Sequence, residues 1–121
     1  MKTLYTYLTV AAFFLLLASP SVTVAQNSKI MDCKFLQTGA ISLYVTDTTL
    51  ISSIKYEVGE SADSLNLFST QYTLADFSNH GSVTNNILQT TLQNFTIPVF
   101  VKVTLLLENG QSEYIEVPST N

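Results

Sequence analysis

Only one residue of the sequence is an obvious candidate for acid–base chemistry at neutral pH. His80 is the only histidine, and it lies among Ser78, Asn79 and Gly81. A serine nucleophile needs such an imidazole beside it as a base, and a metal ion can use one as a ligand. The neighbouring residues are typical of a turn, and they offer the ring no partner that would fix its position. We therefore expect His80 to be an exposed turn residue and the protein to be no enzyme.

Carboxylates are the second kind of side chain with catalytic potential, because a closely held pair can cleave glycosidic bonds. Three acids lie near one loop and two near the C-terminus: Glu57, Glu60, Asp63, Glu113 and Glu116. The odd separation of the last two puts them on opposite faces of a strand. No cation or aromatic pocket accompanies these acids, so we expect solvated surface carboxylates.

A calcium site is the least improbable metal centre. Oxygen-bearing side chains alternate from Asp76 through Ser78 towards His80, as they do in calcium-binding loops. Such loops carry several carboxylates, whereas this one carries only Asp76. We therefore expect no metal ion and no cofactor.

The single cysteine, Cys33, excludes an internal disulfide and a thiolate zinc site. Alternation places it on one face with Met31 and Phe35, which is typical of a small buried apolar residue. An unpaired cysteine in an exported protein also invites an intermolecular disulfide. A homo-oligomer linked through Cys33 or through edge strands therefore stays open as an alternative.

The N-terminal residues have the pattern of an export signal. Lys2 precedes an uncharged apolar run over residues 8–18, and the small residues Thr23 and Ala25 follow. The run is too short for a membrane anchor, so we predict a signal peptide over residues 1–25 that is cleaved after export. Residues 26–121 would then form one domain without a membrane span, secreted into the extracellular space, the periplasm or onto the cell surface.

The charge balance argues against two classes of partner. The chain has five lysines and arginines together against nine acids, and its basic residues form no cluster. Nucleic acids and anionic lipid surfaces both attract basic patches. We therefore expect no nucleic-acid binding and no electrostatic binding to membranes.

Short extended segments with turns about every ten residues predict an all-β fold, an antiparallel β-sandwich of about seven strands. The expected strands are residues 31–36, 41–46, 54–58, 65–72 and 87–92 and the two arms of a hairpin over residues 99–117. Thr73 and Asp76 have the spacing of a helix cap, which predicts a single helical turn. Residues 78–82 are expected to form a loop.

The hairpin allows its register to be predicted. Apolar residues alternate in its first arm, and the Asn-Gly pair at positions 109–110 marks a tight turn. A three-residue loop that ends at Gly110 puts four apolar side chains on one face, because a slip by one residue would reverse the faces. The predicted pairs are Val101 with Val117 and Val103 with Ile115.

This part of the chain resembles a known family. The E–F connection and F–G hairpin of fibronectin type III domains are similar to a pattern formed here by Leu92, Phe95, Pro98, Val99, Val101, Val103, Leu105, Gly110 and Ser112. Residues 42–45 would be strand B and residues 54–58 strand C. The resemblance implies an immunoglobulin-like sandwich that binds or spaces other molecules, without catalytic residues.

Candidate binding and modification sites remain. Four aromatic residues are expected on faces opposite the core, where a cluster would suit a protein or glycan partner unless a sheet or loop covers it: Tyr44, Phe68, Phe100 and Tyr114. Possible glycosylation sites are Asn94, which begins an Asn-Phe-Thr sequon, and Thr48 and Ser64, which each follow an aspartate.

The function expected from the sequence is that of a secreted or cell-surface module for interaction or adhesion, with an extracellular protein or glycan as its partner. A structural subunit that assembles through its terminal β-strands is the alternative. A small secreted enzyme is a third possibility.

Overall fold

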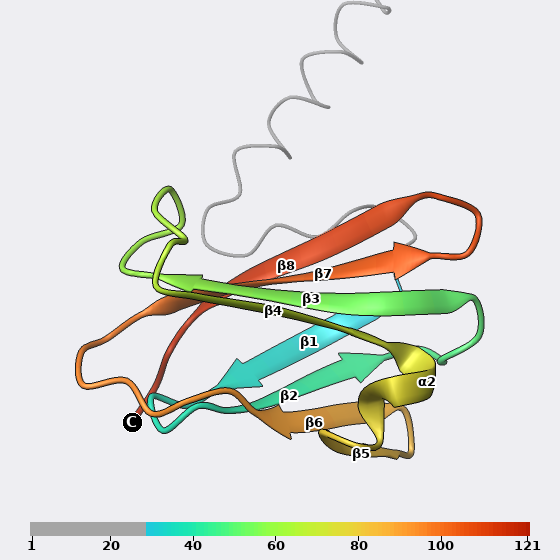
Figure 1. The fold of residues 1–121 in the computed structure, drawn as a ribbon, viewed down its shortest axis with the longest axis horizontal. Helices are drawn as coiled ribbons and strands as arrows, with labels where there is room; N and C mark the ends of the chain where they lie inside the picture. The colour runs from blue at the N-terminus through green and yellow to red at the C-terminus, as the bar shows by residue number, and fades with distance from the viewer. Residues whose placement is uncertain (1–28) are drawn as a thin grey trace, which may run out of the picture.

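The computed structural model describes residues 29–121, so the predicted signal peptide lies outside the described residues. Two antiparallel sheets stack as a β-sandwich, which confirms the predicted fold class (Figure 1). The first sheet has the order β1-β2-β6-β5, with β1 (Ile30–Phe35), β2 (Ala40–Val45), β5 (Gly81–Thr84) and β6 (Ile87–Thr91). The second has the order β4-β3-β7-β8, with β3 (Ile51–Gly59), β4 (Phe68–Thr73), β7 (Phe100–Leu107) and β8 (Ser112–Pro118).

The connection between β4 and β5 contains the single helical turn, α2 (Leu74–Phe77), as predicted. The loop prediction for residues 78–82 was wrong at its end, because β5 begins at Gly81. All four residues of β5 are exposed, and the strand therefore lacks the apolar alternation that reveals a strand in a sequence.

The C-terminal hairpin has the predicted register. Val101 pairs with Val117 and Val103 pairs with Ile115. At the turn, Gly110 has a φ of 90°, and its N–H donates to the carbonyl of Leu107 at 3.0 Å. This left-handed conformation favours glycine, and the hairpin depends on it to keep the apolar residues of both arms on the buried face.

The core lies between the inner faces of the two sheets. Its completely buried side chains come from both sheets and include Leu43, Ile54, Tyr56, Leu88, Val103 and Leu105. Alternate residues of β2, β7 and β8 face inward, as period-two burial requires. β3 alternates in the same way from Ile54 to Val58, after a shift of its register with β7 between Ile51 and Ser53.

Strand β1 departs from simple alternation. The register with β2 shifts between Ile30 and Asp32, so Ile30 is buried while Met31 is 65% exposed. The prediction that Met31 shares a face with Cys33 and Phe35 was therefore wrong, since a bulge adds one residue and reverses the faces before it. Cys33 and Phe35 are both buried, as predicted.

Terminal strands β1 and β8 lie next to each other and are joined at both ends; we call this edge of the sandwich the closed side. At one end, the backbone N–H groups of Lys29 and Ile30 donate to a carboxylate oxygen of Glu113. At the other end, Thr120 donates its N–H to the carbonyl of Phe35 at 2.9 Å. The expectation that Glu113 is a solvated surface acid was wrong, because the hairpin register puts it opposite Leu105 on the buried face.

The opposite edge of the sandwich, which we call the open side, is bounded by β4 and β5. Here α2 connects the two sheets and contacts β3, β4 and β5 (Figure 1). Phe77 anchors the helical turn, since its side chain is completely buried in the core. The candidate functional site begins at this side.

Candidate functional site

Local hydrogen bonds shape the segment that leads to His80. The hydroxyl of Thr73 accepts from the N–H of Asp76 at 3.1 Å and so caps α2. The carboxylate of Asp76 then accepts from Asn79 at 2.7 Å and lies 3.1 Å from Nε2 of His80. The hydrogen bond from Asn79, and next that from His80, holds the pKa of Asp76 below its ordinary value. Asp76 thus connects the helical turn to the histidine.

The ring of His80 is also stacked on an aromatic side chain. Its centroid lies 4.1 Å from that of Tyr72, with 14° between the ring planes. Tyr72 in turn packs edge-on against Phe77, at 6.0 Å between centroids. The carbonyl of His80 accepts from the hydroxyl of Thr90 at 2.6 Å. The expectation that the ring has no fixing partner was therefore wrong, although the side chain is 40% exposed as a turn residue would be.

Sequence reasoning missed these partners because they come from β4 and β6. The separation of four residues between Asp76 and His80 was a signal that a helical turn brings them together. Thr90 becomes a neighbour of His80 through the pairing of β5 with β6. Tyr72 reaches His80 across the α2 turn, which leads from β4 to the other sheet.

A groove of about 340 Å³ lies next to His80 on the outer face of the first sheet. Outward-facing residues with hydroxyl or amide side chains line it, together with His80, the inward-facing Thr90 and short backbone stretches: Ser42, Ser82, Gln89 and Thr91. The side-chain amide of Gln89 donates to the hydroxyl of Ser42 at 3.1 Å. Strand β5 approaches β6 closely at Gly81, where a Cβ would lie 1.9 Å from the carbonyl oxygen of Gln89.

The chemistry available in this groove is that of neutral hydrogen bonding. Its lining contains no carboxylate and no lysine. Among residues 29–121, no serine or threonine hydroxyl is hydrogen-bonded to the ring of His80, as an activated nucleophile would be. The same residues contain no group of three or more histidine, cysteine or acidic side chains that could hold a metal ion. In the segment considered for calcium, Asn79 and His80 already engage both oxygens of Asp76.

Tyr44 lies on the same outer face as the groove. It is two residues from Ser42 along β2, pairs with Ile87 of β6, and is half-buried. The ammonium of Lys34 lies 5.7 Å from the centre of its ring. Tyr44 therefore shares the outer face with the groove but is not part of its lining.

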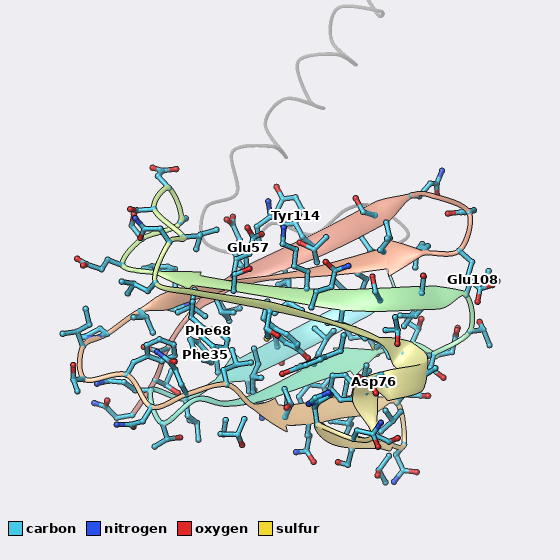
Figure 2. The ribbon with its side chains drawn as sticks, in the orientation of Figure 1. Phe35, Glu57, Phe68, Asp76, Glu108 and Tyr114 are labelled. Atoms are coloured by element: carbon cyan, nitrogen blue, oxygen red, sulfur yellow. The ribbon has the colours of Figure 1, made fainter. Side chains whose placement is uncertain are left out.

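The other three predicted aromatics lie elsewhere. Phe68 pairs with Val58 on the inner face of the second sheet and packs against the core, so the prediction of an outward face was wrong (Figure 2). Phe100 and Tyr114 lie on the outer face of the second sheet, where the ammonium of Lys102 is 4.5 Å from the Tyr114 ring centre. The structure thus does not bring the four residues together.

The possible glycosylation sites all lie in connections between strands. Asn94 is exposed between β6 and β7, and it lines a second groove with Phe95 and Leu36. Ser64 is exposed between β3 and β4, whereas Thr48 is half-buried between β2 and β3. These positions leave the use of the sites as a prediction.

Cys33 is a buried thiol. Burial raises its pKa to about 12, and the neighbouring carboxylate of Asp32 adds to the shift. A thiol that stays protonated and covered is a poor reactant for disulfide exchange. This environment disfavours a disulfide between copies through Cys33.

Within residues 29–121, no helix has the length and apolar character needed to cross a membrane. No family model, no curated protein and no solved structure matches this chain.

Proposed function

We propose that the protein is an exported, non-catalytic binding module and that the groove beside His80 binds a glycan. The observation that carries this proposal is the lining of the groove, which combines neutral hydroxyl and amide groups with His80, a residue whose ring is held by Asp76 and Tyr72. Such groups donate and accept hydrogen bonds as sugar hydroxyls do. A volume of about 340 Å³ also suits a small ligand.

Further features support a glycan at this site. Tyr44 lies on the same outer face, two residues along β2 from Ser42 of the groove lining, and its aromatic ring offers apolar contact to a ligand that extends along this strand. The imidazole of His80 is positioned before any ligand arrives, so binding would cost little ordering of that side chain. The low proportion of charged residues in the chain, 12%, suits a neutral partner.

The strand order supports an immunoglobulin-like or fibronectin type III-like assignment. If β1, β2, β3, β5, β6, β7 and β8 are strands A to G, the sheets read A-B-E-D and C-F-G, with β4 added beside C. Many domains of this architecture bind partners, but the fold alone does not define a function. Assembly through the terminal strands is less favoured, because β1 and β8 are tied to each other on the closed side.

Titration calorimetry with soluble oligosaccharides from plant, algal and microbial polysaccharides tests this proposal. Wild-type protein should bind at least one of them and leave it uncleaved. Each of the variants His80→Ala and Gln89→Ala should bind about five- to tenfold more weakly, the effect of one lost hydrogen bond.

Gln71→Ala is the matched control. Its amide donates to the hydroxyl of Ser53 at 3.0 Å, as Gln89 does to Ser42, but on the outer face of the other sheet. This variant should bind like the wild type. Absence of binding to the whole panel, or equal binding by all three variants, would contradict the proposal.

A further inference from the structure

Strand β4 (Phe68–Thr73) ends the second sheet on the open side, with β3 as its only strand partner among residues 29–121. Its sequence, Phe-Ser-Thr-Gln-Tyr-Thr, contains no charged residue and no proline. Its pairing with β3 is regular over residues 68–73, without a bulge. Natural sheets usually protect an exposed edge with a charged residue, a proline or a bulge, because an unprotected edge pairs readily with another strand. β4 therefore has the character of a pairing edge.

The other three edge strands are less suited to this role. β1 and β8 are tied together on the closed side. β5 has only four residues and begins with a glycine, so it offers few groups for a ladder. β4 has six residues of which most favour extended structure.

Two copies of β4 are complementary to each other in one antiparallel register. When Thr70 lies on a two-fold axis opposite Thr70 of a second copy, Phe68 lies opposite Tyr72 and Ser69 lies opposite Gln71, each pair occurring twice. Residues 68, 70 and 72 share the inner face of the sheet, since they pair with Val58, Tyr56 and Ile54. Cross-strand pairs of two aromatics and of two threonines are favourable.

Charges on the neighbouring strand fit the same register. On the outer face, Glu57 pairs with Ser69 and Lys55 pairs with Gln71. Each row of side chains across the joined sheets would therefore contain Glu57 of one copy and Lys55 of the other. Within each copy these two side chains already form an ion pair at 3.7 Å. The outer face next to the β4 edge is therefore locally neutral and does not repel a second copy.

We propose that two copies of this protein associate through their β4 edges, antiparallel and with Thr70 on the two-fold axis. The result is one continuous sheet with four strands from each copy, a size that open sheets commonly reach. A two-fold contact of this kind uses up both edges and closes at the dimer. The proposal goes beyond the glycan function, because it needs no ligand and involves the other sheet.

Analytical ultracentrifugation of the exported protein, from about 1 μM to 1 mM, tests the association. The wild type should change reversibly from monomer to dimer as concentration rises, with no larger species. A monomer at all concentrations would overturn the proposal, and so would growth beyond the dimer.

Two double variants test the register. Ser69→Lys with Gln71→Lys places like charges directly opposite each other in both outer-face rows, whereas Ser69→Asp with Gln71→Lys places unlike charges there. Both positions are exposed in a single copy, and both variants lose the same hydrogen bond from Gln71 to Ser53. Within one copy, position 69 lies opposite Glu57 and position 71 opposite Lys55, so the second variant has one more pair of like charges than the first. Thermal melts at low concentration should show both variants folded, with the second slightly less stable.

The first double variant should dimerise at least tenfold more weakly than the wild type, and the second should stay within about threefold, since each like-charge pair opposes association. Equal weakening of both would contradict the antiparallel register with Thr70 on the axis. If both variants dimerise at the same protein concentration as the wild type, the contact lies elsewhere on the molecule.

Discussion

On the closed side of the sandwich, β1 and β8 are tied at both ends, by the carboxylate of Glu113 and by the backbone of Thr120. On the open side, β4 and β5 belong to different sheets and are connected through α2 and the stacked pair of Tyr72 and His80. The first side uses its polar groups internally. The second leaves a strand edge and a polar groove accessible, so we infer that partners bind at the open side.

The largest effect should come from removing the tie on the closed side. Glu113→Ala removes the carboxylate that accepts from two backbone N–H groups near the start of β1, which should lower the free energy of unfolding by about 2–4 kcal/mol. A domain of this size would then melt about 10–20 °C lower. Differential scanning calorimetry measures this change.

Glu116→Ala is the control, because Glu116 lies on the same strand but pairs with Lys102 on the outer face. Its effect should stay below about 0.5 kcal/mol. Equal melting temperatures for the two variants would show that Glu113 does not hold the closed side together.

On the open side, we expect a smaller change in stability when the pH is lowered. Hydrogen bonds lower the pKa of Asp76 below its ordinary value of 3.8. A carboxyl group with a lowered pKa stabilises the fold at pH values above 3.8. This contribution to stability is lost as the pH falls through the lowered pKa. The melting temperature of the wild type should therefore exceed that of Asp76→Asn near neutral pH. This difference in melting temperature should shrink as the pH falls below 3.8.

Thermal melts of both proteins across this pH range provide the test. Asp47 also has a lowered pKa, about 2, because of its hydrogen bonds with Lys29 and Thr49. Both proteins contain Asp47, so its titration does not contribute to the difference between them. A difference that stays constant with pH would mean that the charge of Asp76 does not contribute to the open side.

The fold was largely predictable because its strongest signals are local. The Asn-Gly turn and the alternating residues of β7 were enough to establish the register of the hairpin, and Thr73 with Asp76 revealed the helical turn. The same register pairs Glu113 with Leu105 and therefore puts it on the buried face. The spacing between Glu113 and Glu116 shows only that the two acids face opposite ways, and not which of them faces the core. β5 escaped prediction because none of its residues is buried.

The candidate site was less predictable because its parts come from strands of both sheets and meet only in the folded sandwich. His80 stood out as a residue type, but Tyr72 and the groove residues Ser42 and Gln89 come from three different strands. Likewise, Phe68 faces inward because of its pairing with Val58, which its own neighbours in the sequence do not indicate. A single sequence shows which side chains are present, whereas the sheets decide which of them meet.

Hydrogen exchange measured strand by strand, at a low and a high protein concentration, tests the contrast between the two sides most directly. We predict that amides of β4 exchange faster than those of β8 in dilute protein and become protected as concentration rises, while β8 stays unchanged. Exchange in β8 as fast as in β4, or exchange in β4 that does not respond to concentration, would contradict a closed side opposite an open, pairing one.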